Sequence, residues 1–251
     1  PIIGHLPYKG YFDRARAEAA AERLREADAF DVCVSGVTAY STLGWLDDPV
    51  TGPMLRRGAA SLVETLLHEL VHATAFVSEN VDFNESVAQF IGQEAAIRFF
   101  SEDSRSRAEV IAGDSLDLVW PDPEHLRDSI EDRREIARTT GAFRDHLVEL
   151  ADRANPSEER AAAERKARAE LAALPLRVID ANEVAAKARL SNACLALRGA
   201  YMRDLPRHAE VLVALDGDLE AMVRRLVWVA DEELSPDDFY RVEEAGPEER
   251  R

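Results

Sequence analysis

The stretch His68–Glu69–Leu70–Val71–His72 constrains this chain more than any other part of its sequence. Two histidines four residues apart lie on one face of a helix, one turn from each other, so both can bind a single metal ion. Glu69 then points to the side of that ion, where its carboxylate can take a proton from a zinc-bound water. The alternative reading is two core histidines that share this spacing without a metal.

The sequence around this motif predicts a pair of helices. Residues 55–77 contain no proline and are apolar nearly all round, which is typical of a helix buried on every side. The pattern breaks after residue 80, and Asn84 is a good N-cap for a second helix over residues 84–100. A return of the second helix across the first would bring its first turn close to the two histidines.

A catalytic zinc site needs a third protein ligand and an open fourth position. The acidic candidates that follow the motif are Glu79, Asp82, Glu85 and Glu94. Glu79 falls at the end of the first helix and cannot easily fold back. Glu85 lies in the first turn of the second helix, and Glu94 lies roughly 13 Å further along it, so the two cannot both bind one ion. The spacing therefore favours Glu85.

The remaining sequence predicts a mainly α fold with a small β region. The alternating, β-branched residues 30–37 are the best strand candidate. Residues 101–174 are charged and predict a long helical hairpin, interrupted near Pro156. Further helices are expected over residues 12–27, 183–201 and 205–230, with a break at Asp216–Gly217 and a frayed polar tail at the end. We divide the chain into residues 1–100 with the zinc-binding helix pair, 101–234 completing the cleft, and 235–251, all in one compact unit.

Composition narrows the classes of partner. The net charge of −17 disfavours nucleic acid, because the chain cannot neutralise many phosphates. The two cysteines, Cys33 and Cys194, could form one disulfide, and the sequence leaves their pairing open. No apolar run is long enough to span a membrane. The remaining histidines lack metal-ligand spacing and are expected at the surface or in caps: His5, His125, His146 and His208.

Two families resemble this chain. In the gluzincin aminopeptidases, an H-E-x-x-H motif precedes N-E-G-F-A, and the Glu of that second element binds zinc; residues 84–88 resemble it at a shorter spacing. A closer resemblance is to a bacterial family of predicted aminopeptidases. That resemblance departs at Ser191, where the family usually has Asn. It is dense before residue 100 and sparse after 190, and it runs through residues 1–4, 8–13, 36–37, 39–45, 48–49, 68–72, 83–86, 192–193, 195 and 201.

The resemblance implies a gluzincin-like zinc metallopeptidase with one Zn²⁺ per chain, bound by His68, His72 and Glu85, and a peptide or protein substrate. Glu69 would activate the water, and Tyr201 or Tyr40 would stabilise the oxyanion. Members of the family have residues before the start of this chain, often with a lipoprotein-type signal. We therefore expect membrane association only through such an anchor, which would place the protein in the cell envelope or periplasm.

Three functions are consistent with these residues. The first is an aminopeptidase, which needs acidic groups to hold the α-ammonium of its substrate. The second is a zinc endopeptidase with specific protein substrates. The third is a non-catalytic, zinc-stabilised binding protein, against which Glu69 argues, because a purely structural site has no use for that carboxylate.

Overall fold

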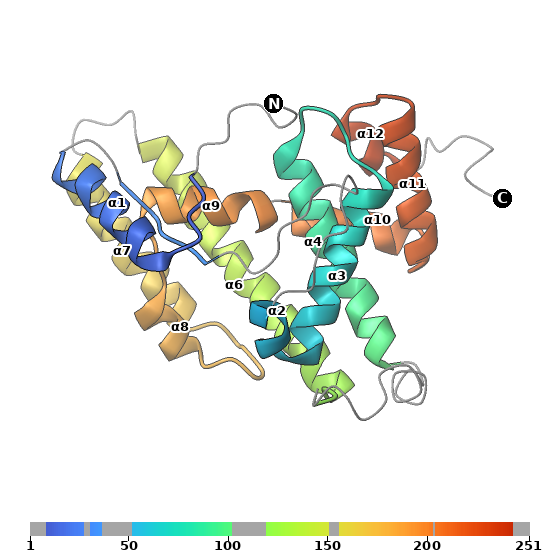
Figure 1. The fold of residues 1–251 in the computed structure, drawn as a ribbon, viewed down its shortest axis with the longest axis horizontal. Coiled ribbons are helices and arrows are strands. Elements are labelled where there is room, and N and C mark those ends of the chain that lie inside the picture. The colour runs from blue at the N-terminus through green and yellow to red at the C-terminus, as the bar shows by residue number, and fades with distance from the viewer. Residues whose placement is uncertain are drawn as a thin grey trace.

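The structure is a computed structural model that describes residues 9–27, 31–36, 52–101, 119–150, 156–202 and 204–242. Within these ranges it is all-helical (Figure 1). The helices are α1 (Arg14–Glu26), α2 (Gly52–Arg56), α3 (Gly58–Thr74), α4 (Val81–Ser101), α6 (Pro123–Leu150), α7 (Pro156–Ala172), α8 (Ala181–Lys187), α9 (Asn192–Met202), α10 (Leu205–Ala214), α11 (Leu219–Asp231) and α12 (Pro236–Tyr240).

The helix pair α3–α4 lies at the centre of the molecule between two groups of helices (Figure 1). On one side, α10, α11 and α12 pack on α4 around the fully buried Phe90, Met222 and Phe239. On the other side, α6, α7, α8 and α9 share a second apolar cluster that includes Phe143 and Leu171. α9 runs from this second group across to α4, so α4 is packed by helices of both groups (Figure 1).

The predicted strand is wrong for the described residues 31–36, which have no regular secondary structure. A strand is stable only when its backbone groups pair with a neighbouring strand, and helices surround this segment. Its carbonyl groups accept hydrogen bonds from arginine side chains instead. Arg25 Nη2 donates to the oxygen of Val32 at 3.2 Å, and Arg189 Nη1 donates to that of Val34 at 2.7 Å.

A disulfide between Cys33 and Cys194 joins this extended segment to α9 across 161 residues of sequence. The amide of Ala193 also donates to Asp31 Oδ2 at 2.9 Å, next to the disulfide. The structure thus answers the question of cysteine pairing that the sequence left open. It also ties the segment that precedes the α3–α4 pair in sequence to a helix that packs against α4.

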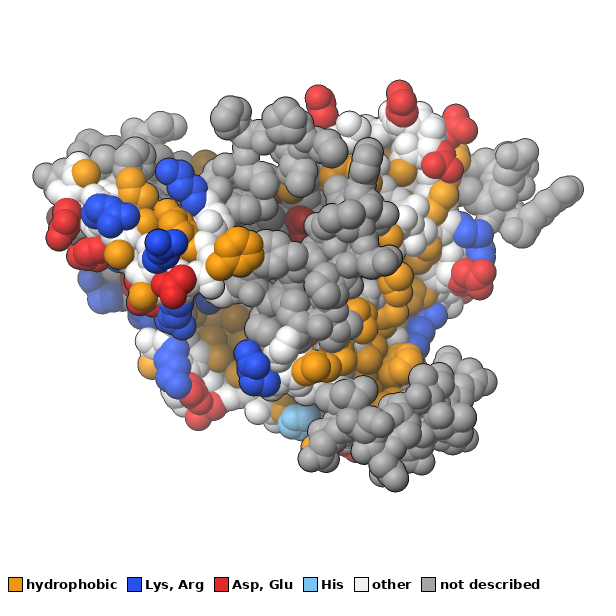
Figure 2. Space-filling model, viewed as in Figure 1, with side chains coloured by type: hydrophobic (Ala, Val, Ile, Leu, Met, Phe, Trp, Pro, Cys, Tyr) orange, Lys and Arg blue, Asp and Glu red, His pale blue; other side chains and the backbone are white. Residues whose placement is uncertain are grey.

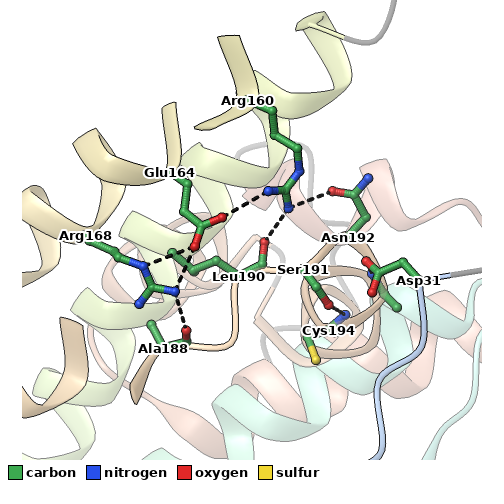
Figure 3. A network of polar contacts seen from close by, with 10 residues as sticks. Asp31, Arg160, Glu164, Arg168, Ala188, Leu190, Ser191, Asn192 and Cys194 are labelled. Atoms are coloured by element: carbon green, nitrogen blue, oxygen red, sulfur yellow. Dashed lines mark hydrogen bonds and ion pairs between the residues drawn. The ribbon is translucent and has the colours of Figure 1, made fainter. Parts of the chain in front are cut away.

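Behind the disulfide, arginines of α7 hold the α8–α9 connection through its carbonyl groups (Figure 3). Arg160 Nη2 donates to Leu190 O at 2.9 Å, and Arg168 Nη2 donates to Ala188 O at 3.1 Å. Glu164 lies between the two guanidinium groups and pairs with both. An open hollow of about 430 Å³ remains at this point, and the arginines around it are bound to backbone oxygens of its wall.

Several helix boundaries differ from the predicted ones for local reasons. The predicted helix over 55–77 is two helices, because Gly58 adopts φ +84° between α2 and α3. The predicted helix over 183–201 is also divided, into α8 and α9. The charged hairpin is confirmed as α6 and α7, while residues 102–118 and 151–155 of the predicted region lie outside the described part of the structure. The break at Asp216–Gly217 is confirmed between α10 and α11, where Gly217 has φ +75°.

Residues 235–242 are more ordered than the frayed tail that the sequence predicted. Residues 236–240 form α12, and Phe239 is completely buried in the core. The guanidinium of Arg225, itself only 2% exposed, donates to the carbonyl oxygens of Phe239 and Arg241 at 2.7 and 2.8 Å. These charge-assisted bonds satisfy the C-terminal carbonyl groups of a helix that is too short to be stable alone.

α3 is not buried on every side, although its sequence predicted that. Leu66 and Leu70 are 37% and 58% exposed and lie one turn apart. Hydrophobic side chains form a band in this region of the surface (Figure 2). Among the described helices, none is both long and apolar enough to cross a membrane.

Candidate metal centre

α3 presents His68 and His72 on the face that packs against α4. Their spacing of four residues puts one imidazole directly above the other along the helix. The two Nε2 atoms are 3.1 Å apart, and each residue is only 8% exposed. Two imidazole nitrogens this close together in a buried position can bind the same metal ion.

Glu85, in the first turns of α4, brings a carboxylate to the same point. Its Oε2 is 3.5 Å from His68 Nε2, and its Oε1 is 3.6 Å from His72 Nε2. Ligands at about 2.0–2.1 Å from a tetrahedral zinc ion are about 3.3 Å from one another. The observed separations fit that value, so these three side chains form a group that could hold a metal ion.

The charge state of Glu85 also suits a metal ligand. Burial raises the pKa of its carboxyl group, but the hydrogen bonds and charges of His68 and His72 outweigh that effect and lower the pKa to about 2. The carboxylate is therefore ionised throughout the neutral range, and only a deprotonated carboxylate binds a metal well.

Asn84 fixes the connection between the two ligand helices. Its Oδ1 accepts from the backbone N–H of Val77 at 2.9 Å, and its Nδ2 donates to the carbonyl of Val77 at 2.7 Å. The predicted N-cap role of Asn84 is wrong, because α4 begins three residues earlier, at Val81. The side chain, only 2% exposed, pairs with the backbone of the loop and so sets where Glu85 enters the site.

Gly92 lets α3 and α4 approach closely beside the histidines. A Cβ placed at this position would lie 3.1 Å from the backbone N of His68 and 3.2 Å from the carbonyl O of Glu64. Both values are shorter than normal van der Waals contact. The absence of a side chain at Gly92 is therefore what allows the Glu85 carboxylate and the His68 ring to meet across the helix pair.

The structure brings together only one of the four acidic candidates with the two histidines. Glu79 is an exposed turn residue with φ +60°, and Asp82 is exposed on the first turn of α4. Glu94 lies further along α4, and its Oε1 accepts from Arg134 Nη1 at 2.8 Å. The third member of the group is Glu85, as the spacing predicted.

The proposed catalytic side chains differ in what the structure says of them. Glu69 is half-buried on α3, and its side chain makes no hydrogen bond or ion pair with any other residue that the structure describes. Tyr40 lies outside the described residues. Tyr201 lies in α9, and its side chain is outside the described part of the structure. Their roles stay predictions.

The buried ion pair next to this centre was not predicted from the sequence. Glu64 lies one turn before His68 and is 8% exposed, and Arg133 of α6 binds both of its carboxylate oxygens at 3.0 and 2.8 Å. The only sign of it in the sequence was a carboxylate four residues before a candidate metal-binding histidine. Nothing local marked Arg133 as its partner.

His208 corrects the prediction that lone histidines lie at the surface or in caps. It is completely buried, and its Nε2 lies 3.0 Å from Ser86 Oγ, next to Glu85 in sequence. Burial, followed by the charges of Arg207 and Arg134, lowers its pKa to about 3, so the ring is neutral. His208 thus joins α10 to the start of α4 without carrying a charge.

Comparison with known families agrees with the residues gathered here. Neither a search of curated proteins nor a search of solved structures finds a match to this chain. A family model with the description "Putative aminopeptidase" matches residues 1–235, which include every residue of the candidate metal centre. The chain therefore belongs to this aminopeptidase family.

Proposed function

We propose that this protein is a zinc-dependent aminopeptidase of the gluzincin type. The observation that carries the proposal is the convergence of His68 Nε2, His72 Nε2 and the Glu85 carboxylate, with separations of 3.1 to 3.6 Å. Two imidazoles and one carboxylate are a donor set that zinc favours. Three protein ligands also leave the fourth position open, as a catalytic site requires and a purely structural site does not.

A zinc ion in this site would polarise the substrate carbonyl and lower the pKa of the attacking water to about 7. His68, His72 and Glu85 would hold the ion. Glu69 takes the proton from the water as it attacks, and later delivers it to the leaving amine. Tyr201 or Tyr40 donates a hydrogen bond to the oxyanion that forms.

The surroundings of the half-buried Glu69 side chain support its assignment as the base. Carboxylates elsewhere on the central helices are paired: Glu64 with Arg133 and Glu94 with Arg134. Among the described residues, Glu69 has no such cation to neutralise it. A carboxylate next to the metal-binding histidines that is not held in an ion pair is available to accept a proton.

The preference for a free amino terminus rests on the family description. An aminopeptidase holds the α-ammonium of its substrate with acidic groups, and the pairing with Arg134 makes Glu94 a poor choice for this task. The alternative is an endopeptidase, which can be told from an aminopeptidase by the length of the peptides it cleaves and by whether a blocked amino terminus prevents cleavage. A peptide with an acetylated amino terminus distinguishes the two activities directly.

The test compares Glu69→Gln with Glu79→Gln, which removes the same charge from an exposed turn. We expect both variants to bind one zinc ion per chain, and only Glu69→Gln to lose peptide hydrolysis, by at least 100-fold. His68→Ala should lose the zinc. Zinc content that does not change in His68→Ala would refute the metal site, and full activity of Glu69→Gln would refute the assigned base.

Cleavage of free but not acetylated peptides would support the aminopeptidase assignment. Equal cleavage of both kinds would instead establish an endopeptidase.

A further inference from the structure

A second polar cross-link joins the two ligand helices one turn away from the metal group. Glu64 lies four residues before His68 on α3, and Gln89 lies four residues after Glu85 on α4. At 1.5 Å per residue, each is about 6 Å along its helix from the corresponding ligand. Gln89 Nε2 donates to Glu64 Oε1 at 2.8 Å. The two helices are thus fixed to each other at this level as well as at the metal ligands.

Arg133 of α6 holds this cross-link from a third helix. Its Nη1 donates to Glu64 Oε1 at 3.0 Å, and its Nη2 donates to Oε2 at 2.8 Å. The two parallel bonds of a guanidinium to a carboxylate fix both distance and orientation, which a single charge does not. The Glu64 side chain is 11% exposed and that of Arg133 is 36% exposed, so the pair is partly shielded from water.

The adjacent Arg134 of α6 binds side chains of α4 in a similar way. It donates to Gln93 Oε1 at 2.7 Å and to Glu94 Oε1 at 2.8 Å. α6 therefore binds α3 through Arg133 and α4 through Arg134, with two consecutive residues. A small rotation of α3 against α4 would have to break bonds to this third helix.

We propose that Arg133 is a positioning residue for the metal centre, acting through Glu64 and Gln89. This inference rests on the proposed function, since it assumes that the two histidines and Glu85 bind zinc. The bidentate pair fixes the rotation of α3 about its own axis, and that rotation aims His68 and His72 at Glu85. Metal–ligand distances tolerate changes of only about 0.2 Å, so small rotations affect affinity.

A different role for Arg133 would be simple neutralisation of the buried Glu64 charge. In that case removing both charges together would restore normal behaviour, because a neutral pair leaves no unpaired ion. If Arg133 positions the metal site, removing both charges should not restore metal binding. The double variant Arg133→Gln/Glu64→Gln should recover the stability of the metal-free protein but keep a weakened metal site.

The experiment uses the full chain, with Arg133→Gln, Arg133→Lys, the double variant, and Arg138→Gln as the control. Arg138 also lies on α6, and it is exposed and pairs with Glu135 at the surface. Zinc affinity is measured by competition with a chromogenic chelator, and site geometry by the visible absorption of bound Co²⁺. Urea unfolding of the chelator-treated protein reports stability separately.

We expect Arg133→Gln and the double variant to weaken zinc binding about 10-fold and to alter the Co²⁺ spectrum. Arg133→Lys keeps the positive charge but loses the two parallel hydrogen bonds of the guanidinium, so it should also alter the Co²⁺ spectrum. Arg138→Gln should match the wild type. Wild-type affinity and spectrum in the double variant, or in Arg133→Lys, would overturn the positioning role. A wild-type protein that binds no zinc would instead refute the proposed function.

Discussion

The close approach of α3 and α4 at Gly92 offers a direct test of how the candidate metal centre is built. In Gly92→Ala, the new methyl group would lie 3.1 Å from the backbone N of His68 and 3.2 Å from both its Cα and the carbonyl O of Glu64. All three atoms belong to the α3 backbone and cannot rotate out of the way. α3 must therefore move away from α4 by a few tenths of an ångström, and His68 moves with it.

Two effects of opposite sign determine the stability of this variant. Alanine is favoured over glycine in a helix interior by about 1 kcal/mol. Overpacking against a rigid neighbour costs about 1–3 kcal/mol. We expect the metal-free protein to be destabilised by up to about 2 kcal/mol. The movement exceeds the tolerance of about 0.2 Å in metal–ligand distances, so zinc affinity should fall about 10-fold.

The matched control is Gly141→Ala in the interior of α6, where a Cβ meets no atom within 4 Å. It should stabilise the protein by about 1 kcal/mol and leave zinc binding unchanged. Urea unfolding in the presence of a chelator measures the first quantity, and chelator competition measures the second. If Gly92→Ala gained as much stability as Gly141→Ala and bound zinc as tightly as the wild type, the close approach would not control the site.

Three further predictions follow from single contacts. Folding lowers the pKa of His208 from 6.5 to about 3, so the folded protein binds fewer protons than the unfolded chain, and the free energy of unfolding of the metal-free protein should fall by about 2 kcal/mol between pH 7 and pH 5. Urea unfolding at each pH should show that His208→Gln abolishes this loss. Reduction of the Cys33–Cys194 disulfide, which closes a 161-residue loop, should lower the free energy of unfolding by up to about 5 kcal/mol, and Cys33→Ser/Cys194→Ser should be insensitive to reductant. Asn84→Ala leaves the backbone N–H of Val77 without a partner and removes one of the two hydrogen bonds to the Val77 carbonyl, so it should cost about 1–3 kcal/mol and weaken zinc binding by chelator competition; an unchanged midpoint in urea would contradict the role given to its side chain.

The candidate metal centre was largely predictable because its signal is local. The spacing of His68 and His72 acts within a single helix, so the sequence alone places both rings on one face. The choice of Glu85 needed only the helix rise and the assumption that the second helix returns across the first. Asp216–Gly217 was predicted as a break for the same kind of reason, since a residue with positive φ ends a helix locally.

The failed predictions concern groups whose partners are distant in sequence. Residues 31–36 have the composition of a strand, but a strand forms only with a neighbour, and here arginine side chains and a disulfide occupy that place. Asn84 has the identity of a cap, yet its partner is the backbone of Val77. His208 gave no local sign that helices on several sides would bury it.

The sequence by itself therefore predicted the chemical groups of the candidate centre, which are two imidazoles, a carboxylate as third candidate ligand and a candidate base, all on one helix pair. Only the tertiary structure decided how those groups are held. Gly92 allows the close approach of α3 and α4, and Arg133, 69 residues from Glu64, binds the Glu64 carboxylate on the α3 side of the pair. The physical reason is that the chemical identity of a ligand is a property of one residue, whereas its position and orientation depend on packing between helices that are distant in sequence.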